Sequence, residues 1–144
     1  MSNLGRAIAI AASAHQDQLD KNGAPYTLHP IRMMLNMDSE EQMIATVLHD
    51  VVEDTEWTLD QLRAEGFSDR IIHLVDLLSR KALESYAEFI ERVRTDPVAV
   101  KIKIADLEDN MDLTRLPKIT GKEISRLKRS HHYWLTLQEN NQNG

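Results

Sequence analysis

Val47-Leu48-His49-Asp50-Val51-Val52-Glu53-Asp54-Thr55 is the segment that decides the fold of this chain. One histidine and three carboxylates occupy six consecutive positions in it, and the residues before and between them are apolar. Apolar residues recur at helical spacing from Met43 to Val51, which predicts a largely buried helix. Burying carboxylates beside such a helix face is costly unless a cation or hydrogen bonds compensate their charge.

The histidine and the acids of this segment are residue types that bind divalent metals. His49 and Glu53 are four residues apart, as are Asp50 and Asp54, so a continuing helical turn aligns each pair. Imidazole and carboxylate groups beside a dry core are typical of a divalent-metal site. The alternative is a helix end whose acids simply face water, and it leaves the histidine and its apolar frame without an explanation.

The composition is that of a globular protein. The chain has 144 residues, of which 42% are hydrophobic and 28% charged, so we expect one domain over residues 1–144 with a substantial core. Cysteine is absent, which excludes disulfides and thiolate metal sites and fits a cytoplasmic location. The polar, Asn- and Gln-rich residues from about Glu139 predict a frayed end.

Charge and hydropathy narrow the choice of partners. A net charge of −6 argues against DNA or RNA, because nucleic-acid binders usually carry a basic face. No apolar run approaches the ~18 residues that span a bilayer, and the N-terminus lacks a signal-peptide pattern, so we expect no membrane association. A phosphorylated ligand must therefore meet a local basic patch or a metal ion. Whether the chain forms a homo-oligomer is left open.

Capping and turn signals predict an all-α chain. Thr58 with Gln61 and Thr120 with Glu123 have capping-box spacing, and Asp96-Pro97 is an N-cap followed by proline at the first helical position. No strand pattern of useful length occurs. We expect seven to eight helices, at about residues 3–19, 31–37, 39–50, 58–66, 68–79 and 85–94, and from 97 and 120 onward.

Two residues outside the central segment have ligand chemistry. His29 precedes Pro30, which is tolerated in the first turn of a helix, so the His29 side chain can point back into a site. Asp106 has apolar neighbours, so we expect it to be partly buried and able to supply an anionic ligand. The acids that follow it, Asp109 among them, are expected in solvent. His15, on an Ala-rich helix face, is interpreted as a hydrogen-bonded core histidine.

The order of these groups resembles the HD-domain metal-dependent phosphohydrolases. It resembles more closely the hydrolase domain of the RelA/SpoT family and its free-standing relatives, the small alarmone hydrolases. The matching stretches span roughly three quarters of the chain in the family's order. They are Ala14-His15 with Gly23-Ala24-Pro25-Tyr26 and His29-Pro30, then Leu48 to Thr55, then Lys103 to Met111.

This resemblance implies an HD-domain helical bundle that holds one Mn²⁺ ion, although other divalent ions suit the same ligands. In the family an acidic pair, here Glu53 and Asp54, positions and activates the attacking water, and Asn110 matches an asparagine near the ribose and phosphate. Such enzymes remove the 3′-pyrophosphate from guanosine tetra- or pentaphosphate. The implied metal ligands are His29, His49, Asp50 and Asp106.

The sequence departs from the family pattern where the family binds its substrate. Asp20 replaces an arginine that lies against the guanine base in the family, and a carboxylate cannot supply that stacking. Leu107, Glu108 and Asp109 stand where the pattern has Arg, Leu and His.

Three residues are candidate substrate contacts with plain structural alternatives. Lys21 and Lys103 are candidate phosphate contacts, or else a turn lysine and a helix-surface lysine. Tyr26 is a wall or hydroxyl donor of the site, or else a packed tyrosine.

The leading hypothesis is thus an Mn²⁺-dependent pyrophosphohydrolase that acts on a nucleotide, with guanosine 3′,5′-bis(diphosphate) as the default substrate. An HD phosphohydrolase that acts on a different nucleotide is one alternative, because of Asp20. A metal-holding module that binds a nucleotide without turnover is another, and the retained Glu53-Asp54 pair argues against it. A third is a helical interaction protein that uses the apolar stripe around Trp134.

Overall fold

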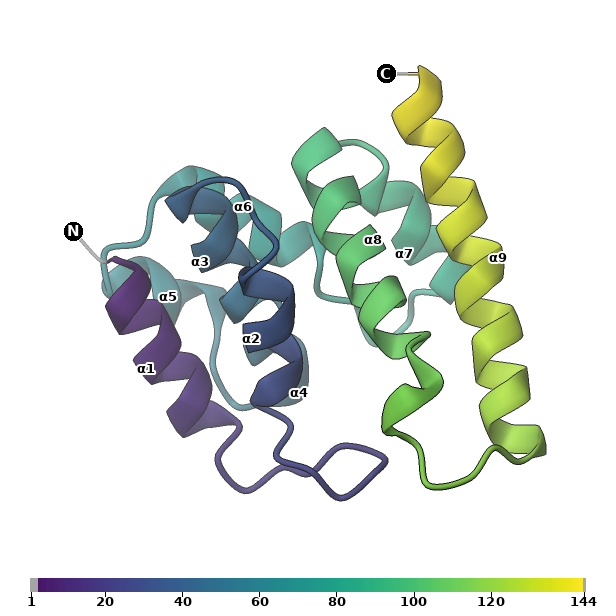
Figure 1. Ribbon diagram of the computed structural model, residues 1–144. Helices are drawn as coiled ribbons and strands as arrows, with labels where there is room; N and C mark the ends of the chain where they lie inside the picture. Colours follow the sequence, from purple (N-terminus) through teal and green to yellow (C-terminus); the bar gives the residue numbers. More distant parts are fainter. Residues whose placement is uncertain (1–2, 144) are drawn as a thin grey trace.

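The structure is a computed structural model that describes residues 3–143, with side chains through Glu139 (Figure 1). The all-α expectation is confirmed, since the described residues contain helices and no strands. The helices are α1 (Leu4–Ala14), α2 (Leu28–Met34), α3 (Glu40–Leu48), α4 (Val51–Asp54), α5 (Leu59–Ala64), α6 (Asp69–Leu77), α7 (Tyr86–Val93), α8 (Pro97–Asn110), the 3-10 helix η1 (Leu113–Arg115) and α9 (Gly121–Asn143). None of the helices in the described part combines the length and the apolar character needed to cross a bilayer.

The helix starts follow from their capping residues. At α5, the Thr58 hydroxyl accepts from the Gln61 amide at 3.1 Å, and the Gln61 side chain accepts from the Thr58 amide at 2.9 Å, a complete capping box. At α3, Ser39 accepts from the Gln42 amide, but the Gln42 side chain accepts from the Asp38 amide instead of closing the box. Each cap satisfies amides that the first helical turn leaves without a partner.

Several helix boundaries differ from the predictions; α2, for example, spans Leu28–Met34 rather than 31–37. Helix α1 ends at Ala14 rather than near Leu19, because the chain folds back on itself: the Tyr26 amide donates to the Gln18 carbonyl at 2.9 Å, and Leu19 pairs with Pro25. At the other end, α9 extends to Asn143, and the predicted frayed end falls mostly on residues whose side chains, from 140 onward, lie outside the described part, as does Gly144.

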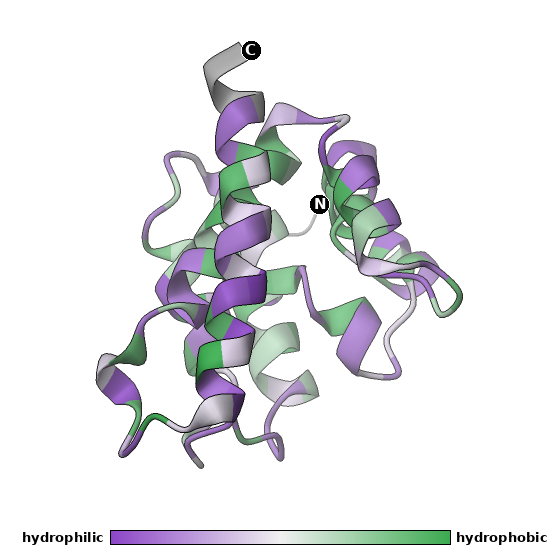
Figure 2. Cartoon of the chain, turned by 90° about the vertical axis from the view of Figure 1, so that its right-hand side faces the viewer, coloured by the Kyte–Doolittle hydropathy of each residue, from purple (hydrophilic) through white to green (hydrophobic). Residues whose placement is uncertain are grey.

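The buried core consists of two clusters. One gathers apolar residues mainly from α6, α7 and α8, with Leu137 of α9 fully buried in it. The other gathers residues from α1, α3, α5 and α6, and Met43 packs against both. Figure 1 shows α9 beside α8 at one side of the molecule, with α1 at the opposite side. Figure 2 shows that α9 presents mostly hydrophilic residues on its outer face.

Candidate functional site

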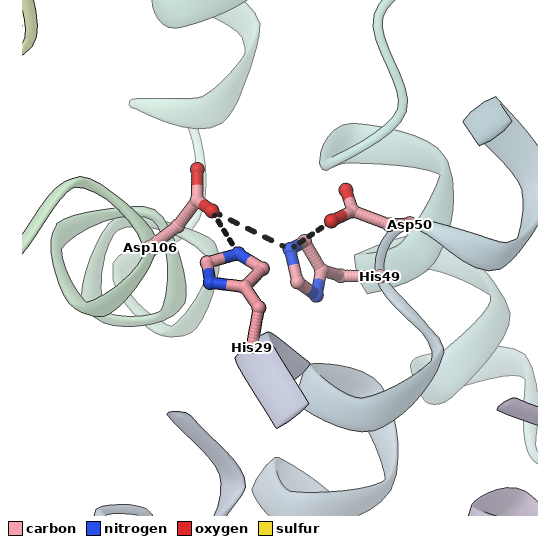
Figure 3. A group of neighbouring side chains, drawn as sticks. All are labelled: His29, His49, Asp50 and Asp106. Atoms are coloured by element: carbon pink, nitrogen blue, oxygen red, sulfur yellow. Dashed lines mark hydrogen bonds and ion pairs between the residues drawn. The ribbon is translucent and has the colours of Figure 1, made fainter. Parts of the chain in front are cut away.

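Three separate helical segments bring the candidate metal ligands together. His29 lies in the first turn of α2, Asp106 lies in α8, and His49-Asp50 occupy the break between α3 and α4 (Figure 3). Helix α3 ends at Leu48 and the one-turn helix α4 resumes at Val51, so the His-Asp pair sits at a bend rather than inside one helix. This bend turns the His49 and Asp50 side chains toward the same point.

The four side chains form one compact group. The Nε2 atom of His29 is 2.8 Å from Oδ1 of Asp106, and Nε2 of His49 is 3.0 Å from Oδ2 of Asp50 and 3.7 Å from Oδ1 of Asp106. One potential ligand atom from each residue lies within 4.8 Å of all the others. Both histidines and Asp106 are buried, and Asp50 is nearly so.

The donor atoms of this group fit a divalent cation. The Nδ1–H of His49 donates a hydrogen bond to the Thr46 carbonyl at 2.6 Å, so Nε2 is the ring nitrogen that can ligate a metal. That Nε2 atom is buried and has no hydrogen-bond partner of suitable alignment among the described residues, although two carboxylates lie close to it. Two imidazole nitrogens and two carboxylates are a donor set that can bind a divalent metal ion.

Without a metal, the carboxylates of the group raise the pKa values of its two histidines. Burial lowers the pKa of His29, but its hydrogen bonds to Asp106 and Asp109 outweigh burial and raise that pKa to about 9. Burial likewise opposes charge on His49, yet Asp50 and Asp106 raise its pKa well above the usual value. The carboxylates therefore already attract positive charge to this point, which is the electrostatic condition for binding a cation.

Asp109 is not in solvent, which corrects the sequence-based prediction. Its Oδ2 lies 2.6 Å from Nδ1 of His29, and the Arg32 guanidinium donates to both carboxylate oxygens, at 2.8 and 2.9 Å. Arg115 approaches the same carboxylate at 3.5 Å. The prediction failed because the α8 face that carries Asp109 packs against α2, and no local pattern shows this contact. The adjacent Glu108 and Asp112 are exposed, as predicted.

The candidate substrate contacts on α8 prove to be partners of a candidate metal ligand. Lys103 is buried and its Nζ donates to Oδ2 of Asp106 at 2.6 Å, so it is not a helix-surface lysine. Its ammonium also lies 5.4 Å from the ring centroid of Tyr86 and 5.2 Å from that of Phe89. The Asn110 amide donates weakly to Oδ1 of Asp106 at 3.4 Å. Both residues line the cavity that adjoins the site.

Tyr26 and His15 lie beside the candidate ligand group, toward α1. The Tyr26 hydroxyl donates to Oδ2 of Asp50, and burial together with that carboxylate raises the pKa of Tyr26. The Tyr26 ring stands 5.0 Å from the His15 ring. His15 is buried and hydrogen-bonded through Nδ1 to Gln18 at 2.9 Å, as interpreted from the sequence, but its Nε2 has no partner among the described side chains.

The acidic pair flanks the ligand group on the α4 side. Asp50, Glu53 and Asp54 have carboxylate oxygens within 4.8 Å of one another. Glu53 accepts from the Arg80 amide at 2.6 Å, which fixes its side chain. Burial, reinforced by the Asp50 and Glu53 charges, raises the pKa of Asp54 to about 6. Both acids remain accessible to solvent.

A cavity of about 370 Å³ adjoins the ligand group. His29 and Asp106 contribute to its lining, and so do Arg126 and Arg129 of α9. These two arginines and Lys21 have no ion pair among the described residues. Burial and then the charges of the two arginines lower the pKa of Lys21, and the Glu123 charge opposes this shift. The sequence-based reasoning did not identify the α9 arginines, because they are far from every family motif.

The acids of the cavity wall are engaged with the protein itself. Oδ1 of Asp20 accepts from the Asn22 amide at 2.8 Å and the Ala24 amide at 3.0 Å, which closes the turn before Pro25. Asp112 accepts from the Thr114 amide and pairs with Arg115, and Glu123 caps the start of α9. Asp20 and Glu123 are thus hydrogen-bonded to backbone amides, and the Glu123 charge acts on Lys21 and Arg126.

Comparison with known proteins places the chain in a family. The HD domain family matches residues 7–99, so the chain belongs to the HD-domain family. A solved structure of a protein described as a metazoan ortholog of SpoT that hydrolyzes ppGpp and plays a role in starvation responses has the same fold, with a TM-score of 0.71 at 24% identity over 100% of this chain and 97% of that one.

Several curated proteins are similar in sequence. The chain is 38% identical to a probable GTP pyrophosphokinase of Mycobacterium leprae, over 80% of this chain and 16% of the relative. It is 34% and 30% identical to the guanosine-3′,5′-bis(diphosphate) 3′-pyrophosphohydrolases of Haemophilus influenzae and Aquifex aeolicus, over 71% and 74% of this chain. The chain spans about a sixth of the length of these relatives, 16–17%.

Proposed function

We propose that this chain is a metal-dependent phosphohydrolase that acts as one domain in the cytoplasm and removes the 3′-pyrophosphate from guanosine 3′,5′-bis(diphosphate). The observation that carries the proposal is the buried group of His29, His49, Asp50 and Asp106, two of which line the adjoining cavity. Membership of the HD-domain family and the activity named for two of its relatives support it.

We propose Mn²⁺ as the cofactor, because a mixed set of imidazole and carboxylate donors suits this ion. When bound, a divalent cation offsets negative charge on phosphate oxygens and favours the ionisation of water. The protein holds the donor atoms in place beforehand: Tyr26 orients Asp50, and Lys103 orients Asp106. His49 is oriented by the Thr46 carbonyl.

In this proposal Glu53 and Asp54 orient and activate the attacking water. Glu53, which the Arg80 amide holds, orients a water molecule beside Asp50, and Asp54 accepts a hydrogen bond from the same water. The oxygens of Glu53 and Asp54 lie within 4.8 Å of Asp50, and in this proposal they contact the water rather than the metal. We therefore expect changes at Glu53 to affect turnover more than metal affinity.

The cavity receives the nucleotide in this proposal. A substrate with several phosphate groups is strongly anionic, and Lys21, Arg126 and Arg129 are the cavity cations without an ion pair among the described residues. Asn110 offers an amide beside Asp106 for a ribose or phosphate oxygen. The net charge of −6 makes this local basic surface the part of the molecule that can attract such a ligand.

A different nucleotide is the second candidate substrate, and Asp20 is the observation that favours it. Its carboxylate lies in the cavity wall where the family pattern has an arginine against guanine. A carboxylate there repels nearby phosphates and can accept hydrogen bonds from a base, so the preferred base can differ. A module that binds metal and nucleotide without turnover is the remaining alternative.

The test is pyrophosphate and phosphate release over a nucleotide panel that includes guanosine 3′,5′-bis(diphosphate), with Mn²⁺ and after chelation. We expect Mn²⁺-dependent release of pyrophosphate from that compound. Glu53→Gln should bind Mn²⁺ with near-normal affinity and lose turnover by roughly a hundredfold or more. Glu56→Gln, an exposed acid three residues further on, is the matched control and should keep full activity.

Each result decides between the alternatives. Activity on other nucleotides alone would retain the hydrolase and reject the guanosine substrate. Stoichiometric Mn²⁺ with no turnover of any compound would favour the binding module. Unchanged metal content in His49→Ala and Asp50→Ala would reject the ligand set itself.

A further inference from the structure

The imidazole of His29 is bonded at both nitrogens to carboxylates of one helix. Asp106 and Asp109 are three residues apart on α8, so they lie on the same face and reach the ring from opposite sides. Oδ1 of Asp106 is 2.8 Å from Nε2, and Oδ2 of Asp109 is 2.6 Å from Nδ1. Asp106 is within the ligand group, whereas Asp109 lies behind the ring.

A histidine must present an unprotonated nitrogen to a metal. When Nδ1–H of a neutral imidazole donates a hydrogen bond to a carboxylate, Nε2 is the nitrogen with the free lone pair, and the ring is held in one orientation and made more basic. The contact between His29 and Asp109 has this geometry. Asp109 thereby places Nε2, not Nδ1, toward His49 and Asp106.

Asp109 is itself held in one position. Arg32 lies three residues after His29 on α2, so its guanidinium and the imidazole face the same carboxylate, and it donates to both oxygens at 2.8 and 2.9 Å. The ion pair with Arg32 therefore keeps Oδ2 of Asp109 in place to accept a hydrogen bond from Nδ1 of His29.

The two candidate histidine ligands are thus oriented by different means. The Nδ1–H of His49 donates a hydrogen bond to the Thr46 carbonyl at 2.6 Å. The acceptor is a backbone group of the preceding helix α3, so no side-chain change removes it. His29 depends on a side chain from another helix.

We propose that Asp109, held by Arg32, is a positioning residue that fixes His29 as an Nε2 metal ligand, and that Arg32 acts through Asp109. This inference rests on the proposed assignment of His29 as a ligand. Asparagine in its place keeps one oxygen but loses the charge, so Nδ1 and the Arg32 guanidinium compete for a single weaker acceptor, and the ring is held less firmly and made less basic. Metal affinity then falls although every ligand is still present.

The test is Mn²⁺ binding to the full chain, measured as free Mn²⁺ by electron paramagnetic resonance. Asp109→Asn should raise the Kd for Mn²⁺ about 10–100-fold, the usual effect of losing such a partner. Asp112→Asn is the matched control: it removes the same charge from an acid that pairs with Arg115 at 3.0 Å without contacting His29, and its Kd should stay within about twofold. Thermal unfolding with chelator present separates lost affinity from lost stability.

Two further readouts report on positioning. Imidazole ¹⁵N NMR of the metal-free wild type should show a His29 Nδ1 proton protected by its hydrogen bond, and that signal should be lost in Asp109→Asn and kept in Asp112→Asn. Arg32→Gln should weaken Mn²⁺ binding less than Asp109→Asn does, and adding it to Asp109→Asn should cause little further loss.

The outcomes distinguish this inference from the proposed function. If the wild type binds no Mn²⁺, the ligand assignment and the proposed function fail together. If the wild type binds Mn²⁺ and Asp109→Asn binds it equally well, only the positioning role is overturned. An unprotected His29 Nδ1 in the wild type, or fully additive effects of the Arg32 and Asp109 changes, would also overturn it.

Discussion

The charge of Lys103 should be a principal source of stability for the metal-free protein. Its ammonium is buried and donates to Oδ2 of Asp106 at 2.6 Å. Hydrogen bonds and the opposite charge of Asp106 outweigh burial and raise the pKa of Lys103 above its usual value. Replacing it with methionine, Lys103→Met, keeps an unbranched side chain against the Tyr86 and Phe89 rings and removes only the charge and the donor.

The expected loss follows from what remains around Asp106. Removing one partner of a buried ion pair costs about 3–5 kcal/mol, because the other charge is left uncompensated. His29 also hydrogen-bonds the Asp106 carboxylate, so we expect the lower end, about 3 kcal/mol. For a chain of this size about 1 kcal/mol shifts the unfolding temperature by roughly 4 °C, so Lys103→Met should unfold roughly 12 °C lower.

The assay is thermal and urea unfolding followed by circular dichroism, with chelator present so that no metal contributes. Lys101→Met is the matched control on the same helix: its ammonium pairs with the exposed carboxylate of Asp38, and its loss should cost less than about 1 kcal/mol. If Lys103→Met costs no more than Lys101→Met, the two histidines alone neutralise Asp106, and the reasoning about Lys103 is wrong.

Three further predictions concern the cavity and the α6–α7 junction. Asp20→Asn keeps the oxygen that closes the turn and removes the negative charge, so it should bind a phosphorylated nucleotide several-fold more tightly in an equilibrium titration. Asp20→Arg should in addition destabilise the turn. Equal binding by wild type and Asp20→Asn would contradict this reasoning. Arg126→Gln should weaken binding of the same nucleotide roughly tenfold, because Arg126 lines the cavity. Lys128 lies outside the cavity lining, so Lys128→Gln should leave that binding unchanged. Equal effects of the two changes would indicate only a general charge effect. Hydrogen bonds from Arg92 hold the pKa of Glu84 to about 2, below its usual value, so this pair stabilises the fold above about pH 4.5 and the stabilisation is lost as the pH falls toward 2. Glu84→Gln should therefore cost about 1 kcal/mol at pH 7 in urea unfolding and progressively less below pH 4, and a pH-independent difference would reject the assignment.

The sequence by itself determined the helices and the residue types of the site. Capping residues and apolar periodicity act over three to four positions, so the start of α5 at Thr58 and the all-α class followed from local patterns. The His49-Asp50 pair was evident for the same reason, since its apolar frame and its acids are neighbours in the chain. A local pattern cannot show where a helix ends when its residues have better partners elsewhere, as at the end of α1.

Only the tertiary structure decided how the side chains of distant segments meet. Packing of α2 against α8 joins His29 to Asp106 and Asp109, residues that are 77 and 80 positions away. This contact moved Asp109 from an expected solvent position into the support of a candidate ligand. It also made Lys103 a buried partner of Asp106. The physical reason is that burial and charge pairing depend on which helix faces are brought together, and the chain order of the residues does not specify those faces.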